Sequence, residues 1–313
     1  MEAIHALTDF LGHFTPAQYC QTYYLFGAAV ILSVHVLPRE LQSALLDYGA
    51  RQQRSNNTSG IDSNTWTKKT LTSLLTCLEV PHSWFLHFYV LSVAGSAFWA
   101  WQFVTRGAIM EAIAQAQVKD GSRSAELGSV FVAWTLMAVQ GLRRLYESLV
   151  IMKAGKSPMS SVHWIVGLAY YACMSVSVWV EGSGAILESW TTSQAPSLPS
   201  TRAVLGVILF IYASFKQNEC HKHLSGLRKY TLPHQGWFQH IICPHYTSEC
   251  LIYVALSLVA SPPDTVVNRT VFTGLLFVAV NLGTTANTTK KWYAEKVGAE
   301  KVASRWKMIP FVF

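Results

Sequence analysis

The residues best suited to chemistry lie in one polar segment near the C-terminus, residues 216–253. Apolar stretches flank this polar segment, and ionisable side chains beside membrane-length apolar stretches indicate a functional site by default. The segment combines imidazoles, thiols, cations and aromatic rings. Such a mixture suits either a metal ion or a nucleotide.

The histidines and cysteines of the polar segment lack the spacing of a zinc site. A structural zinc site pairs two matching halves, such as two CxxC motifs, and the run Cys220-His221-x-His223 has no second half. We therefore predict no metal site among His221, His223, His234, His240, His245, Cys220, Cys243 and Cys250.

A nucleotide fits the polar segment better. Arg228 and Lys229 offer cations to phosphate groups, Tyr230 offers a ring for stacking, and histidines and glutamates can hydrogen-bond ribose or amide groups. No GxGxxG motif occurs in the chain, so a dinucleotide would not be held by a Rossmann turn.

A second charged group, Arg143, Arg144 and Glu147, lies inside the apolar stretch 127–151. The spacing of three and four residues places all three on one helix face, where Glu147 can pair with Arg143. Lys153 and Lys156 follow closely, and such a cluster of cations suits phosphate groups. The alternative is a helix end whose long side chains extend to the membrane surface. We prefer phosphate binding.

Glu79 ends an amphipathic helix predicted over 66–80, just before Pro81 and a second apolar stretch. A carboxylate at this depth could donate a proton or anchor a polar lipid head. The alternative is a helix-end residue that faces water. The position of Glu79 alone does not decide between a functional and a solvent-facing carboxylate.

The elements that must position these residues are apolar helices. Of 313 residues, 51% are hydrophobic and only 13% charged, about half the charged share of a soluble domain. This composition predicts an all-α, polytopic membrane protein. Seven transmembrane helices fit a bilayer-spanning length of about twenty residues, at 19–38, 83–105, 127–151, 161–181, 203–216, 247–261 and 270–286.

The basic residues predict the orientation of these spans. Most of them fall on one side of a seven-span arrangement, which places the N-terminus in the lumen and the polar segment and C-terminus in the cytosol. Because the cations are dispersed among loops, the net charge of +7 does not indicate nucleic-acid binding. We divide the chain into a substrate-side region, 1–200, and a cofactor-side region, 201–313.

Several motifs in this sequence resemble the steroid 5α-reductase family. The C-terminal region carries LRK at 227–229, LPHQGWF at 232–238, PHYTSE at 244–249, KKWY at 290–293 and a final IPFVF. Upstream, VPHSWFLHFY at 80–89 and GLRRLYESL at 141–149 resemble the polyprenol (polyprenal) reductase branch rather than the steroid branch. The resemblance covers about two thirds of the chain, with its motifs in the family's order.

The resemblance implies an enzyme of the endoplasmic-reticulum membrane that uses NADPH to reduce an activated carbon–carbon double bond. In the polyprenol branch the partner is a long-chain polyisoprenoid lipid, and the product feeds dolichol synthesis for protein N-glycosylation. An α,β-unsaturated polyprenal is easier to reduce than the free polyprenol. Hydride would go to the β-carbon while an acid hydrogen-bonds the carbonyl oxygen.

The resemblance also implies roles for individual residues. Arg228, Glu249 and Tyr293 match the family's cofactor residues directly, whereas Gln217, His221 and His245 stand where steroid reductases carry Asn, Asp and Asn. The full expected cofactor set is Arg144, Lys153, Lys156, Gln217, His221, Arg228, Lys229, Tyr230, His245, Glu249 and Tyr293.

The expected catalytic residues are Glu79, Gln140 and Tyr146. Glu79 matches the family's acidic residue that holds the substrate carbonyl. Gln140 stands where steroid reductases carry the catalytic tyrosine, and an amide cannot serve as that acid. Glu79 would then act alone, or Tyr146 or a water molecule would contribute.

Other functions stay open at this stage. Within the same fold, a 3-oxo-Δ4-steroid 5α-reductase or an enoyl-thioester reductase is the nearest alternative. An isoprenylcysteine-type membrane methyltransferase would use an adenosine cofactor instead. A receptor or transporter would oxidise no NADPH with any lipid.

Overall fold

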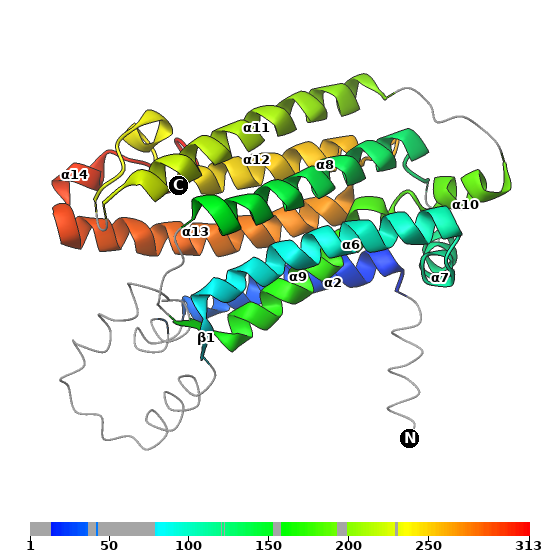
Figure 1. Ribbon diagram of the computed structural model, residues 1–313, viewed down its shortest axis with the longest axis horizontal. Helices are drawn as coiled ribbons and strands as arrows, with labels where there is room; N and C mark the ends of the chain where they lie inside the picture. The colour runs from blue at the N-terminus through cyan, green and yellow to red at the C-terminus, as the bar shows by residue number, and fades with distance from the viewer. Residues whose placement is uncertain are drawn as a thin grey trace, which may run out of the picture.

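The computed structural model describes residues 14–36, 42, 79–119, 121, 123–152, 158–192, 199–228 and 231–313. This part of the chain is mostly helical, and its long helices run roughly along one axis of an elongated bundle (Figure 1). The helices α11, α12, α8 and α13 lie in the upper part of that view, with α6, α9 and α2 below them.

A long helix coincides with each of the seven predicted spans. They are α2 (Pro16–Val34), α6 (Leu86–Thr105), α8 (Leu127–Tyr146), α9 (Ser161–Val180), α11 (Thr201–Gly226), α12 (Pro244–Val259) and α13 (Arg269–Val297). Among the described residues, α9 and α13 are long and apolar enough to cross a membrane by length and composition. The number of spans and their orientation stay predictions.

Shorter elements complete the fold. They are the helices α7 (Ala108–Val118), α10 (Ser183–Thr191) and α14 (Glu300–Ala303), the 3₁₀ turns η2 (His82–Phe85) and η4 (Gly236–Gln239), and the π-helical turn η3 (Glu147–Ile151). The predicted helix over 66–80 lies outside the described residues except for its last two, which are in a strand.

The mostly helical structure agrees with the all-α prediction, and one small two-stranded sheet is added to the helices. Strand β1 (Glu79–Pro81) pairs antiparallel with β2 (Pro158–Ser160), with Glu79 opposite Ser160 and Pro81 opposite Pro158. The residue before a proline is pushed toward extended backbone, which suits Val80 to a short strand rather than to the end of a helix.

Local sequence signals explain where the site helices begin. The Ser200 hydroxyl accepts the Ala203 N–H at 3.2 Å and caps α11, and Pro244 occupies the first turn of α12. Asn268 caps α13 in the same way through the Val271 N–H at 2.8 Å. These caps satisfy amide groups that a helix start leaves unpaired.

Two glycines allow the site helices to approach closely. A β-carbon at Gly206 would lie 2.6 Å from Val259 Cγ2, so glycine lets α11 pack along α12. A β-carbon at Gly141 would lie 2.8 Å from Ser92 Oγ, so glycine brings α8 against α6. The main core draws buried residues from α2, α8, α9, α11, α12 and α13, on both sides of the proposed boundary at residue 200.

Candidate active site

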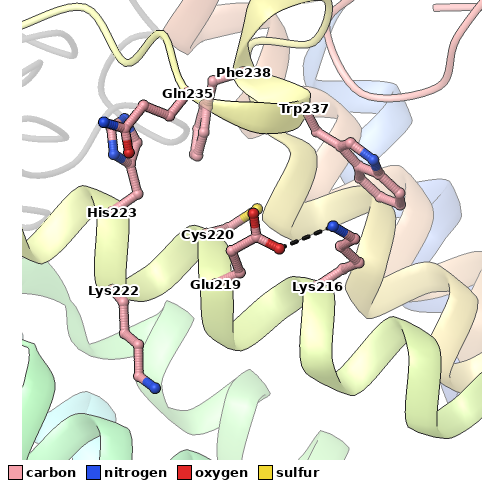
Figure 2. Close-up of a pocket in the computed structure, with 8 residues that line it drawn as sticks. All are labelled: Lys216, Glu219, Cys220, Lys222, His223, Gln235, Trp237 and Phe238. Atoms are coloured by element: carbon pink, nitrogen blue, oxygen red, sulfur yellow. Dashed lines mark hydrogen bonds and ion pairs between the residues drawn. The ribbon is translucent and has the colours of Figure 1, made fainter.

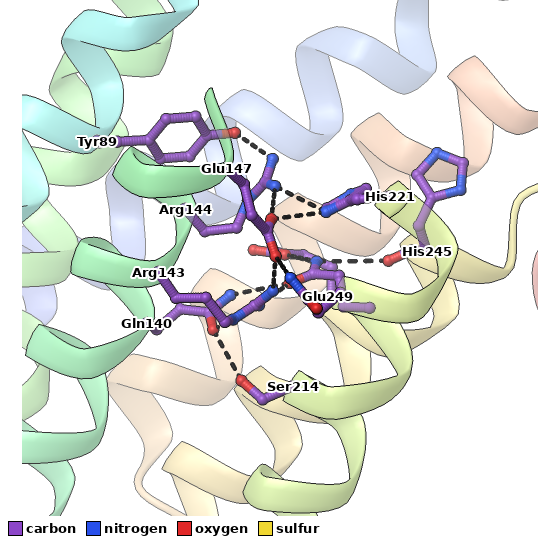
Figure 3. Close-up of polar contacts among 11 residues, drawn as sticks. Tyr89, Gln140, Arg143, Arg144, Glu147, Ser214, His221, His245 and Glu249 are labelled. Atoms are coloured by element: carbon purple, nitrogen blue, oxygen red, sulfur yellow. Dashed lines mark hydrogen bonds and ion pairs between the residues drawn. The ribbon is translucent and has the colours of Figure 1, made fainter. Parts of the chain in front are cut away.

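Two polar stripes face each other between α8 and α11 (Figure 3). On α8 and the turn that follows it, the stripe is Gln140, Arg143, Arg144 and Glu147, and on α11 it is Ser214, Gln217, Asn218 and His221. Both have the spacing i, i+3, i+4 and i+7, which places each set on one helix face. We call these eight residues, with Tyr89 and Glu249, the polar cluster.

Glu147 is the centre of the polar cluster. Its side chain is 0% exposed and forms ion pairs with Arg143 and Arg144. Its oxygens also lie 2.6 Å from Asn218 Nδ2 and 2.7 Å from His221 Nδ1, both on α11. The carboxylate therefore joins α8 to α11, and the surrounding donors offset the cost of burying its charge.

A chain of amides continues from Glu147 toward α12. Gln140 Nε2 donates to Gln217 Oε1 at 3.1 Å, and its own Oε1 accepts from Arg143 at 2.9 Å and from Ser214 at 3.1 Å. Gln217 also accepts from Arg143 and donates to Glu249. Gln140 is thus a structural link between helices, with its amide fully engaged.

Tyr89 brings α6 into the polar cluster. Arg144 Nη2 donates to Tyr89 Oη at 2.5 Å, and the guanidinium carbon lies 4.7 Å from the centre of the ring. The close approach of α6 and α8 at Gly141 makes this contact possible. Arg144 therefore touches Tyr89, Glu147 and His221 at once (Figure 3).

The neutral form is favoured at physiological pH for His221 in the polar cluster and for His245 beside it. Burial, reinforced by the positive charge of Arg144, lowers the pKa of His221 to about 4, and Glu147 only partly opposes this. Burial also lowers the pKa of His245 well below its usual value, with His221 and Arg144 adding to the effect. Two arginines and two glutamates then balance, so the polar cluster has no net charge.

Among the buried nitrogens that have no hydrogen-bond partner in the described part of the chain, three lie in or near the polar cluster: Arg143 Nε, His245 Nδ1 and His223 Nε2. His223 also lines a pocket of about 230 Å³ between α11 and residues 235–238, with Lys216, Lys222 and Trp237 (Figure 2). Buried polar atoms normally find a partner, so these nitrogens suit a polar ligand.

The structure brings six of the predicted site residues together. Gln140, Arg144, Gln217, Glu249 and His221 belong to the polar cluster, and the ring centre of His245 lies 5.8 Å from that of His221. The expectation that Glu147 pairs with Arg143 is confirmed. Both arginines, however, are already engaged by that carboxylate rather than presented as an open phosphate site.

Four other predicted residues lie outside the polar cluster. Glu79 is exposed at the start of β1, Arg228 is exposed just after α11, and Tyr293 is half-buried in α13. Tyr146 is 56% exposed, so its hydroxyl does not join the buried network beside it. The predicted residues Lys153, Lys156, Lys229 and Tyr230 lie outside the described part of the chain.

Sequence reasoning did not assign site roles to Tyr89, Glu147, Ser214 and Asn218. The repeated i, i+3, i+4, i+7 spacing of polar residues within apolar stretches is the signal that could have found all but one of them. Tyr89 has no such signal, because its role in the polar cluster depends on a contact between separate helices.

The sequence of the C-terminal part of the chain, which includes α11 and α12, matches a known protein family. Residues 163–313 match the family described as 3-oxo-5-alpha-steroid 4-dehydrogenase. Over this C-terminal part the chain is similar to the steroid 5α-reductase family.

Its curated relatives include polyprenal reductases from several organisms. The chain is 28% identical to polyprenal reductase 1 of Oryza sativa subsp. indica over 286 residues, which cover 74% of this chain and 79% of the relative. It is 30% identical to the polyprenal reductase of Xenopus tropicalis, over 59% of this chain and 61% of the relative. The match to the Caenorhabditis elegans polyprenal reductase is 26% identical and covers 77% and 82%.

Proposed function

We propose that this protein is an NADPH-dependent polyprenal reductase that saturates the α-isoprene double bond of a long-chain polyprenal. The product would enter the route to dolichol for protein N-glycosylation. The observation that carries this proposal is the polar cluster, where residues expected to hold the cofactor meet in one buried network. The similarity to polyprenal reductases supports the choice of substrate.

The residues present fit a nicotinamide cofactor. The orphaned nitrogens of Arg143 and His245 suit the neutral, hydrogen-bonding part of such a molecule, because the polar cluster itself is electrically balanced. Its phosphates need additional cations, for which Arg228 and the predicted Lys153, Lys156 and Lys229 are candidates. Tyr230 and Tyr293 would complete the site. Bound there, the cofactor supplies the hydride that reduces the double bond.

The proposed division of the chain gives each region a task. Residues 201–313 supply α11 and α12 with Gln217, His221, His245 and Glu249, and so hold the cofactor side. Residues 1–200 supply α6 and α8 and form the substrate side, with Glu79 proposed to hold the carbonyl group. The two regions meet at the polar cluster.

A bilayer is the environment that this proposal requires. One face of α11 presents a continuous stripe of exposed apolar side chains, namely Val204, Leu205, Ile208, Ile211, Tyr212 and Phe215. An exposed apolar stripe of this kind suits lipid chains or a polyisoprenoid. We propose that the protein resides in the endoplasmic-reticulum membrane, with its N-terminus in the lumen and its C-terminus and cofactor site in the cytosol.

The proposal is tested by NADPH oxidation with the purified protein in detergent. Polyprenal, polyprenol and a 3-oxo-Δ4 steroid are compared at equal concentration, and the lipid products are identified by mass spectrometry. We expect turnover with polyprenal and none with the other two. Turnover only with the steroid would favour the second candidate, a steroid 5α-reductase, which the description of the matched family suggests. Oxidation with none of them would refute the proposal.

A further inference from the structure

We propose that Tyr89 is the acid that delivers a proton to the substrate's carbonyl oxygen during reduction. This inference rests on the proposed function and names a residue for a step that Gln140 cannot perform. Tyr89 lies on α6, whereas the residues around the polar cluster that are proposed for the cofactor lie on α8, α11 and α12.

The hydrogen bonding of Tyr89 leaves its own proton available. The side chain is 8% exposed, and Oη accepts a hydrogen from Arg144 Nη2 at 2.5 Å. Within the described residues, this donor is the partner of Oη, and no acceptor for the phenolic hydrogen is present. A buried hydroxyl normally donates as well as accepts. The missing acceptor is what a substrate carbonyl oxygen would provide.

Arg144 prepares Tyr89 for this task. Its guanidinium donates to Oη and so stabilises the negative charge that develops on the oxygen as the proton leaves. Glu147 holds the same guanidinium from the other side through an ion pair, and His221 Nδ1 lies 2.8 Å from it. Arg144, which supports the acid, is therefore also part of the proposed cofactor site. This arrangement brings the source of the proton close to the source of the hydride.

The other candidate acids are less well placed. Gln140 has no acidic proton and its amide is engaged by Gln217, Arg143 and Ser214. Tyr146 is exposed, and Glu79 is exposed in β1. Of these candidates, Tyr89 is the one with an acidic proton that also belongs to the polar cluster, where it accepts a hydrogen bond from Arg144.

The step balances as follows. Hydride arrives at the β-carbon, the carbon–carbon π bond breaks, and its electrons shift so that the carbonyl oxygen takes up negative charge. The Oη–H bond of Tyr89 breaks and the proton passes to that oxygen, giving an enol that tautomerises to the saturated aldehyde. The phenolate left on Tyr89 takes a proton from water. The substrate gains one hydride and one proton overall.

The test compares Tyr89→Phe with Tyr170→Phe in the full-length protein. Tyr170 is a matched control because it is also a buried tyrosine, with 5% of its surface exposed. It lies among aromatic rings such as Tyr24 and Phe277, outside the polar cluster. With polyprenal and NADPH, we expect kcat to fall about 10²–10⁴-fold in Tyr89→Phe. The control should keep its kcat, and both variants should bind NADPH as the wild type does.

A second measurement distinguishes chemistry from structure. Replacing Tyr89 by 3-fluorotyrosine keeps the hydroxyl but makes it more acidic, so the alkaline limb of the kcat profile should move to lower pH. An unmoved limb, or wild-type kcat in Tyr89→Phe, would overturn the assignment while leaving the proposed function intact. Absence of polyprenal turnover in the wild type would overturn both. If Tyr89→Phe fails to bind NADPH, the fluorotyrosine profile decides alone.

Discussion

Replacing Glu147 by alanine should strongly destabilise the protein. The change removes a fully buried carboxylate that pairs with Arg143 and Arg144, accepts from Asn218 and lies 2.7 Å from His221 Nδ1. Two guanidinium groups would then lie close together with Glu249 as the remaining negative charge beside them. Breaking one partner of a buried ion pair costs about 3–5 kcal/mol, and the total stability of a typical protein is only about 5–15 kcal/mol.

A surface ion pair of the same chemistry provides the control. Glu219 pairs with Lys216 at 2.9 Å on α11, but its side chain is 49% exposed. Exposed pairs contribute about 0–1 kcal/mol, so Glu219→Ala should change the free energy of unfolding little. A second comparison is Arg143→Ala combined with Glu147→Ala. Because the two side chains form one unit, the double variant should lose less than the sum of the single losses.

The assay is denaturant unfolding of the purified protein in one detergent, followed by intrinsic tryptophan fluorescence. We expect Glu147→Ala to lower the midpoint far more than Glu219→Ala, and to weaken NADPH binding as Arg144 and His221 lose their shared partner. Equal midpoints for the two alanine variants would refute the view that Glu147 holds α8 to α11.

Three further predictions concern individual residues. The pKa of His221 is lowered to about 4, so its neutral ring contributes stability above about pH 6.5. As the pH falls from there toward 4, the free energy of unfolding should decrease by about 3 kcal/mol. In His221→Asn, the free energy of unfolding measured on acidification should decrease less. Arg202→Met removes the hydrogen bonds to the carbonyls of Ser261 at 2.9 Å and Pro262 at 3.1 Å. Thermal unfolding should then show a free energy of unfolding lower by about 1–3 kcal/mol, while the affinity for NADPH stays unchanged. Gln217→Leu should weaken NADPH binding measured by fluorescence titration, because Glu249 loses its amide donor; an unchanged affinity would remove Gln217 from the cofactor site.

The helices were predictable because membrane-length apolar stretches have clear ends. The stretch at 161–181 became α9 (Ser161–Val180), and the one at 270–286 lies within α13 (Arg269–Val297). The stretch at 203–216 predicted only part of α11, which continues to Gly226 because polar residues on a helix can face a polar partner helix. Hydropathy does not detect such an extension.

The contacts of the site were less predictable, because they join residues far apart in the sequence. The pairing of Glu147 with Arg143 follows from helix geometry alone and is confirmed. The bonds from Glu147 to Asn218 and His221 depend on how α8 meets α11, which spacing along one helix does not determine. The same limit explains why Tyr89 was missed as a proton donor. Tyr146 is also a tyrosine and lies near Arg144 in the sequence, so it was named instead.

The arrangement of charge explains how such a polar site can be buried at all. Arg143 and Arg144 share the carboxylate of Glu147, Glu249 brings a second negative charge close to both, and the neutral form of both histidines is favoured, so burial leaves no net charge. The charge balance also limits what the site can bind. A neutral network adds little to the affinity for an anionic phosphate, whereas an amide or carbonyl group can hydrogen-bond to the network's unpaired nitrogens. The polar cluster therefore suits the reacting ends of cofactor and substrate, and cations outside it, such as Arg228, suit the phosphates. Arg144, shared between Glu147 and Tyr89, is the residue through which the two reacting ends would be held in register.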